Sequence, residues 1–147
     1  MLIRRMELKD VDRISELEAV AFSMPWHKES FIEMIENPDA IYVVALVDDI
    51  PVGVCGIRSI VGEGDISNVV VDPDFRRRGI AKAMLEKAME IGQRDYGIGA
   101  FTLEVRVSNQ AAIGLYEGLG FKGEGIRPGF YDLPDEDALI MWRRIDA

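Results

Sequence analysis

The stretch DPDFRRRGIAKAML, residues 72–85, predicts the fold on either side of it. It follows the apolar, β-branched run Asn68–Val71 and leads into residues with helical spacing, so we expect a strand, a short loop and a helix. Gly79 stands where that helix begins. A glycine there lets a ligand approach the backbone closely, and the unpaired N–H groups of the first helical turn attract phosphate.

Three consecutive arginines, Arg76, Arg77 and Arg78, precede this glycine in a chain whose formal net charge is −9. Charge runs are usually solvated, so an exposed turn between strand and helix is one interpretation. A site for an anionic ligand such as a pyrophosphate is the other. The ATP-binding P-loop is excluded, because the Gly-x-x-x-x-Gly-Lys-Ser/Thr spacing is absent.

Composition predicts one ordinary domain, residues 1–147, with 48% hydrophobic and 29% charged residues. The sequence pI near 4.6 argues against a nucleic-acid partner and suits a cationic substrate better. The sequence shows no apolar run of membrane-spanning length and no signal-peptide pattern at its start, so we expect a cytoplasmic protein with no membrane partner.

The chain has one cysteine, Cys55, and one histidine, His27. This excludes an internal disulfide framework and a thiolate-rich metal site, and we expect no bound metal. Cys55 lies inside an apolar, strand-like run, where cysteine usually behaves as a small buried hydrophobe. A catalytic pair of Cys55 and His27 is the less favoured alternative.

The order of predicted elements indicates an α/β sheet with helices on its faces. We expect each strand to lie parallel to the strand that follows its crossover helix. The first long helix is expected to bury Val11, Ile14, Leu17 and Val20. The predicted strands are 2–4, 40–47, 52–60, 66–71, 101–107, 122–130 and 138–145, and the predicted helices are 8–21, 28–36, 80–96 and 110–119.

One motif is misleading. Gly118-Leu-Gly120-Phe-Lys-Gly123 matches the G-x-G-x-x-G dinucleotide fingerprint. That fingerprint must leave a strand and open a helix, whereas this segment leaves a helix and enters a strand. Gly120 is better interpreted as a left-handed residue that ends the helix, and it implies no cofactor.

Glu104 is the candidate general base. It lies midway along a strand that we expect near the centre of the sheet, where an idle carboxylate is costly to bury. The alternative is that this face of the strand is exposed to solvent, with Glu104 paired to Arg106 or a neighbour.

Tyr116 is the candidate general acid. It shares the inward stripe of its helix with Ala112, Leu115 and Leu119, so the alternative is a core tyrosine. The aromatic, proline-broken connection Phe22-Ser-Met-Pro-Trp26 also has two interpretations. It either packs the first two helices together or forms a wall beside a substrate.

Two motifs carry a family resemblance. Arg76-x-x-Gly79-x-Ala81 resembles the Arg/Gln-x-x-Gly-x-Gly/Ala signature of the GNAT acetyltransferases. The segment Phe101–Phe121 is similar to the L-E-V-R-x-S-N-x-x-A-x-x-L-Y-x-x-L-G-F block of the RimI branch, and residues 22–26 match its F-S-x-P-W. Enzymes of that branch acetylate the amino-terminal alanine of a small-subunit ribosomal protein.

The resemblance implies a GNAT fold, a mixed sheet of about seven strands with helices on both faces, and acetyl-CoA as co-substrate. It implies that Val69, Val70 and Val71 pair with the pantetheine arm. It places the pyrophosphate on the loop and first helical turn, and it places Asn109 and Tyr116 beside the cofactor. The implied pyrophosphate residues are Arg76, Arg77, Arg78, Gly79, Ile80 and Ala81.

For catalysis, the resemblance implies Glu104 as general base, Tyr116 as general acid and no acyl-enzyme. On the acceptor side it implies Phe22, Met24, Pro25, Trp26 and Tyr131, with a protein N-terminus, most simply that of a basic ribosomal protein, as substrate. The chain departs from its relatives just before Tyr131, where it reads Arg127-Pro-Gly-Phe; this bears on peptide selectivity and leaves the cofactor site untouched.

Three functions remain open at this stage. The first is an N-terminal protein acetyltransferase selective for alanine. The second is an enzyme of the same kind with broader protein specificity, or one acting on small amines such as polyamines or aminoglycosides. The third is a non-catalytic module that binds acyl-CoA.

Overall fold

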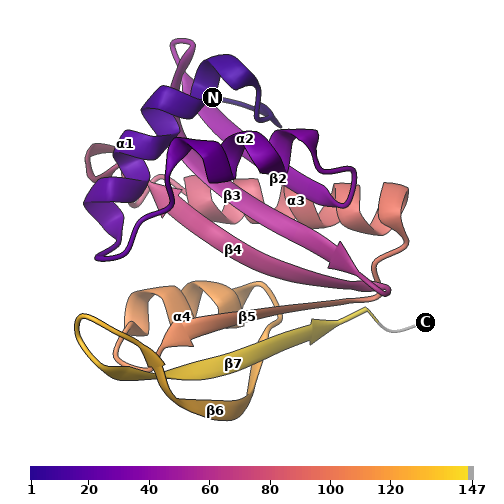
Figure 1. The fold of residues 1–147 in the computed structure, drawn as a ribbon. Coiled ribbons are helices and arrows are strands. Elements are labelled where there is room, and N and C mark those ends of the chain that lie inside the picture. Colours follow the sequence, from indigo (N-terminus) through magenta and orange to yellow (C-terminus); the bar gives the residue numbers. More distant parts are fainter. Residues whose placement is uncertain (146–147) are drawn as a thin grey trace.

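The computed structural model describes residues 1–145, built on one seven-stranded mixed sheet in the order β1-β2-β3-β4-β5-β7-β6 (Figure 1). The last two residues of the expected 1–147 domain lie outside this range. Short 3₁₀ turns occupy Leu8–Asp10 and Pro73–Phe75. The strands are β1 (Leu2–Arg5), β2 (Ala40–Val47), β3 (Ile50–Ile60), β4 (Glu63–Val71), β5 (Ala100–Arg106), β6 (Lys122–Tyr131) and β7 (Glu136–Arg144), and the helices are α1 (Val11–Ala21), α2 (Lys28–Glu36), α3 (Ile80–Tyr96) and α4 (Gln110–Gly118).

Strand pairing confirms the expected parallel neighbours at one helical connection and contradicts them at two. β1 and β2, which α1 and α2 connect, are neighbours but antiparallel. β4 and β5, which α3 connects, are parallel. β5 and β6, which α4 connects, are not neighbours, because β7 lies between them and pairs antiparallel with both. Burial explains the difference. β7 contributes the buried Ala138 and Met141, whereas nearly every residue of β6 is exposed, so the more apolar strand takes the interior position and the polar one the edge.

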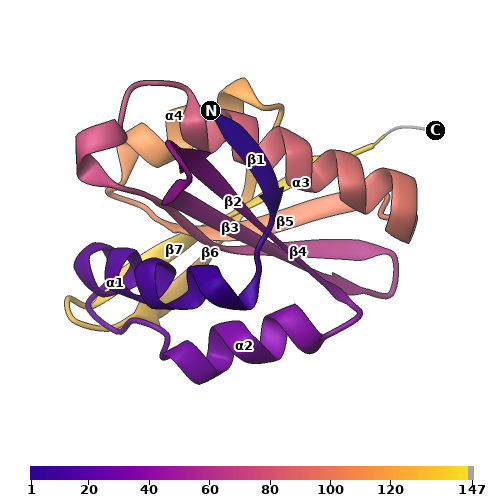
Figure 2. The same ribbon diagram turned by 90° about the horizontal axis from the view of Figure 1, so that it is seen from above.

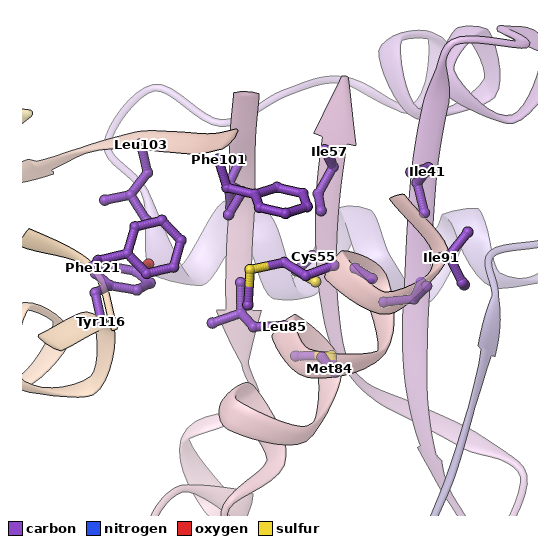
Figure 3. Close-up of a cluster of buried hydrophobic side chains, with 14 of the residues drawn as sticks. Ile41, Cys55, Ile57, Met84, Leu85, Ile91, Phe101, Leu103, Tyr116 and Phe121 are labelled. Atoms are coloured by element: carbon purple, nitrogen blue, oxygen red, sulfur yellow. The ribbon is translucent and has the colours of Figure 1, made fainter. Parts of the chain in front are cut away.

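Helices cover both faces of the sheet, but not equally (Figure 2). On one face, α3 and α4 pack over a core that includes Leu85, Phe101 and Met141 (Figure 3). On the other face, α1 and α2 pack over β2, β3 and β4 around Ile14 and Phe31. β5 therefore alternates between buried and partly exposed residues, and the side of β5 that carries Glu104 has no buried residue.

The inward stripe of α1 corrects the sequence prediction at one position. Val11, Ile14 and Leu17 are buried as expected, but Val20 is 74% exposed. Glu18 takes the inward position, because it lies four residues after Ile14 and seven after Val11. The helix thus directs a carboxylate into the protein.

Glycines and one asparagine set the helix ends, with Gly79 and Gly120 in the positions predicted for them. α3 begins after Gly79, whose φ is +73°, and ends before Gly97, whose φ is +65°. Gly120 follows α4 with a φ of +93°. Asn109 caps α4 by accepting a hydrogen bond from Ala112 N–H at 3.2 Å. Within residues 1–145, no helix is both long and apolar enough to cross a membrane.

Gly56 provides the space in which the Tyr42 ring lies. A Cβ at Gly56 would lie 2.1 Å from that ring. We expect Gly56→Ala to lower the free energy of unfolding by about 1–3 kcal/mol, since overpacking forces the core apart. Urea denaturation measures this, and Gly99→Ala is the matched control, because nothing lies within 4 Å of that position. Equal effects of the two substitutions would contradict the prediction.

Candidate active site

The site is built around the parting of β4 from β5. Only the first residues of the two strands pair, from Glu63 with Ala100 to Asp65 with Thr102. Beyond that point the strands diverge (Figure 1). On its other side, β4 continues to pair with β3, as far as Val71 with Gly53. The edge of β4 that faces β5 therefore leaves main-chain groups without a strand partner, and such groups need one from a ligand or from water.

Val69, Val70 and Val71 lie on this open stretch. Val70 is buried, while Val69 and Val71 are partly buried and pack against the core under α3. A bulge precedes them: the register with β3 shifts between Val54 and Gly56, and Asn68 has a φ of +57°. Bulges increase strand twist and redirect the residues that follow.

The arginine loop presents cations and free amides at the end of β4. Arg76, Arg77 and Arg78 are all exposed, and among residues 1–145 no carboxylate lies within 4.0 Å of their side-chain nitrogens. The guanidinium of Arg78 lies 4.9 Å from the centre of the Phe75 ring. Positive charge in this loop is therefore available to an anion.

The first turn of α3 adds N–H donors to that charge. Its first intrahelical bond joins Ala83 N–H to the Gly79 carbonyl at 3.0 Å, so the amides of Ile80 and Ala81 have no partner within the helix. N–H groups of a first helical turn point out of the helix end, so these two amides are directed toward the arginine loop. Gly79 has open space around its Cβ position, and its left-handed backbone is the reason for a glycine there.

Glu104 projects from β5 toward the α1 and α2 face of the sheet, but those helices pack over β2, β3 and β4 rather than over β5. Its side chain is 22% exposed, and its Oε1 lies 3.6 Å from Arg127 Nη1 on β6. Partial burial raises the pKa of Glu104, the nearby Asp65 carboxylate raises it further, and Arg127 opposes both effects. The alternative interpretation paired Glu104 with Arg106 or a neighbour. Arg106 is not the partner, since it binds Glu136 at 3.3 Å, but the neighbouring Arg127 is.

Asp65 and Arg127 are functional candidates that no sequence motif indicated, and Arg127 stood out only as part of the departure from the relatives before Tyr131. Asp65 pairs in register with Thr102 on β5, and its partial burial raises the pKa of its carboxyl group. Asp65 and Arg127 reach Glu104 from different strands, far apart in sequence. The spacing of the residues therefore carried no signal for this cluster.

Tyr116 is almost fully buried, on the opposite face of β5 from Glu104. Its ring meets Phe121 edge to face at 6.0 Å (Figure 3). Burial raises the pKa of its hydroxyl above the usual tyrosine value, and Tyr131 contributes in the same direction. Tyr131 in turn has its pKa raised by burial and then by Glu104. Tyr131 therefore interacts electrostatically with Glu104 on one side and with Tyr116 on the other.

The acceptor-side candidates divide into packed and exposed residues. Trp26 packs 5.4 Å from Phe31 and 6.0 Å from Tyr42, which confirms a packing role for the tryptophan. Phe22 and Met24 are exposed, by 41% and 64%, so neither joins α1 to α2. Pro25 is partly buried. The segment thus has a fixed end at Trp26 and an apolar, accessible end at Phe22.

Cys55 and His27 do not form a catalytic pair. Burial raises the pKa of the Cys55 thiol to about 12, which disfavours the nucleophilic thiolate. His27 is exposed at the start of α2. Within the part of the chain that the structure describes, no group of three or more His, Cys, Asp or Glu side chains gathers as a metal site. The chemistry that Glu104 and Tyr116 offer is proton transfer by a carboxylate and a phenol, beside a cationic loop.

Comparison with known proteins identifies the family. A model of the acetyltransferase (GNAT) family matches residues 11–121. The chain therefore belongs to the acetyltransferase (GNAT) family.

Individual relatives narrow the comparison. The chain is 35% identical over 144 residues to the [ribosomal protein bS18]-alanine N-acetyltransferase of Escherichia coli, covering 95% of this chain and 94% of the relative. It is 39% identical over 145 residues to a Bacillus subtilis protein provisionally named for the same activity, covering 98% and 95%. A crystal structure of the ribosomal-protein-S18-alanine N-acetyltransferase from Escherichia coli superposes with a TM-score of 0.89 at 30% identity, covering 99% of this chain and 94% of that one. The expected GNAT fold is confirmed.

The neighbours of Glu104 generate a prediction about its titration. We expect Asp65→Asn to lower the pKa of Glu104, because a like charge is removed, and Arg127→Gln to raise it, because an opposite charge is removed. Carboxyl carbon chemical shifts followed against pH measure both changes. Glu86→Gln, an exposed substitution on α3, is the control. Shifts of the same sign in the two variants would contradict this account of the charges.

Proposed function

We propose that this chain, acting as a single domain over residues 1–147, transfers acetyl from acetyl-CoA to the α-amino group of a protein. The proposed acceptor is the N-terminal alanine of the small-subunit ribosomal protein bS18, which the relatives' names specify. The observation that supports the proposal most is the divergence of β4 from β5 beside Glu104. It leaves main-chain groups of β4 unpaired close to a carboxylate. A ribosomal acceptor places the enzyme in the cytoplasm.

The residues present fit acetyl-CoA as co-substrate. Val69, Val70 and Val71 offer main-chain groups to an amide-bearing arm, as a neighbouring strand would. Arg76–Ala81 would hold the pyrophosphate through free amides, the helix dipole and unneutralised arginines. Asn109, which caps α4, would lie beside the cofactor. Acetyl-CoA would supply the activated acetyl group as a thioester.

Glu104 would accept the proton that the acceptor amine must lose before it attacks. An α-ammonium group has a reference pKa of about 7.7–8, so most of it is protonated at neutral pH. The raised pKa of Glu104 brings the base closer to that value and improves proton transfer. Tyr131 and the exposed end of the Phe22–Trp26 segment, with Met24 and Pro25, would flank the incoming N-terminus.

Tyr116 would return a proton to the departing thiolate. Its burial keeps the phenol neutral, and so able to donate. A main-chain N–H of the Val69–Val71 stretch would donate to the carbonyl oxygen as negative charge grows there. Base and acid lie on opposite faces of β5, and a substrate that passes between β4 and β5 would meet both.

Cofactor binding can be tested without any acceptor. We expect calorimetry to detect binding of acetyl-CoA and of CoA, and Gly79→Val to weaken it about tenfold or more, because a β-branched residue resists a positive φ. Gly118→Val is the control, since it lies on exposed helix surface with no positive φ. Absence of heat with the unaltered protein would overturn the proposed function.

A peptide panel tests the acceptor. We expect turnover with acetyl-CoA to be fastest for peptides that begin with alanine, and slower for peptides that begin with serine or methionine. Acetylated peptides that offer only a lysine should not react, because their α-amino group is blocked. Selectivity for polyamines or aminoglycosides would favour the small-amine alternative, and binding of acetyl-CoA without turnover of any amine would favour the non-catalytic module.

The assignment of the base has its own test. We expect Glu104→Gln to lower kcat about 100-fold or more, the usual effect of losing general-base catalysis, with little change in the dissociation constant for acetyl-CoA. Steady-state kinetics and calorimetry measure the two quantities. Glu136→Gln, which breaks the ion pair with Arg106, is the comparison variant. Unchanged turnover in Glu104→Gln would assign the base to another group.

A further inference from the structure

Glu18 is a buried carboxylate with no cationic partner. Its side chain points inward from α1 and the residue is 2% exposed. Among residues 1–145, no Lys, Arg or His nitrogen lies within 4.0 Å of it. Burying an unpaired carboxylate is costly unless hydrogen bonds compensate. The structure supplies those hydrogen bonds from two separate segments.

The first segment is the acceptor-side connection, and the second is the bulge of β4. The main-chain N–H of Trp26 donates a hydrogen bond to Glu18 Oε2 at 3.0 Å. Asn68 Nδ2 donates to Glu18 Oε1 at 3.2 Å, and lies 3.4 Å from Oε2. Both neighbouring groups are hydrogen-bond donors, and the Glu18 carboxylate offers one acceptor oxygen to each of them. Glu18 thus joins the Phe22–Trp26 segment to the strand that carries Val69–Val71.

Tyr42 closes the same connection from the other side. Its hydroxyl donates to Asn68 Oδ1 at 2.7 Å, and its ring packs against Trp26. Ser67 Oγ also donates to Asn68 Oδ1, at 3.0 Å. Asn68 itself is held with a positive φ, a conformation that is uncommon outside glycine. Glu18, Trp26, Tyr42 and Asn68 therefore form a closed ring of contacts between the acceptor side and the bulge.

We propose that Glu18 is a positioning residue for acetyl transfer, which holds the acceptor-side segment at a fixed distance from the β4 bulge through Trp26 and Asn68. This proposal rests on the proposed function. Its effect falls on the acceptor rather than on acetyl-CoA, because β4 beyond the bulge is also held by its ladder to β3, at Val54 with Val70 and Gly53 with Val71. Residues 22–26 pair with no strand of the described sheet, and apart from the bond to Glu18 the segment is supported by packing of the Trp26 ring on Phe31 and Tyr42.

A reciprocal exchange of polar groups tests the link. In Glu18→Gln, the new amide group faces a donor, either Trp26 N–H or the Asn68 amide. In Asn68→Asp, two carboxylates face each other. In the double variant, the amide introduced at position 18 donates to the carboxylate introduced at position 68 and its carbonyl oxygen still accepts from Trp26. That carboxylate still accepts from Tyr42 and Ser67, and an aspartate tolerates the positive φ of position 68.

We expect each single variant to raise the KM for an alanine-starting peptide about tenfold or more, the size expected for losing a hydrogen bond to a charged group. The dissociation constant for acetyl-CoA should change by less than about threefold, and the double variant should recover most of the peptide KM. Glu16→Gln is the matched control, because it removes the same charge from the exposed side of the same helix.

Amide hydrogen exchange at Trp26 provides a readout independent of turnover. We expect Trp26 N–H to be protected in the unaltered protein, less protected in each single variant, and protected again in the double variant. A double variant as impaired as the single variants, or single variants that match Glu16→Gln, would overturn the proposal. Unaltered protein that acetylates no peptide would instead overturn the proposed function, and exchange at Trp26 would still decide whether Glu18 holds the segment.

Discussion

The short parallel ladder between β4 and β5 is the constraint on which the site depends. β5 pairs with β7 along its whole length, from Ala100 to Arg106, and β4 pairs with β3 as far as Val71. Each strand is therefore held more firmly by its outer neighbour than by the other. With the bulge at Asn68 adding twist to β4, the two halves of the sheet separate after Asp65.

That separation brings groups of opposite charge to different parts of the same opening. The exposed arginines and free amides lie where β4 runs into α3, and the carboxylates of Asp65 and Glu104 lie near where the strands begin to part. An anionic cofactor and a cationic acceptor are attracted to different parts by simple electrostatics. The net charge of −9 then adds to the attraction for a basic protein.

Unfavourable local features gather around this opening, as is common near functional sites. Glu18 is buried without a cation, Asn68 has a left-handed backbone, and the two carboxylates Asp65 and Glu104 share the nearby Arg127. The close fit of the Tyr42 side chain over Gly56 fixes the position of Tyr42 in the closed ring of contacts with Glu18, Trp26 and Asn68. These features lower the stability of the fold locally, and the two hydrophobic cores, one on each face of the sheet, offset that loss.

The sequence by itself determined the features that depend on neighbouring residues. Helical spacing, the glycines at 79 and 97, and the Asn109 cap predicted the helices closely, since periodicity and backbone conformation act over a few positions. Apolar and polar residues alternate over 101–106, which by itself puts Glu104 on the opposite face from Phe101 and Leu103, as in β5. Recognition of the family followed from the same local motifs.

Only the tertiary structure decided what depends on distant residues. The place of β7 between β5 and β6 follows from the relative burial of two strands, and the partners of Glu104 come from β4 and β6. The spacing of Glu18 from Ile14 is that of an inward-facing residue, but the function of a carboxylate at that position does not follow from the spacing. A carboxylate at that spacing becomes interpretable only when folding brings Trp26 and Asn68, from two other segments, to its oxygens.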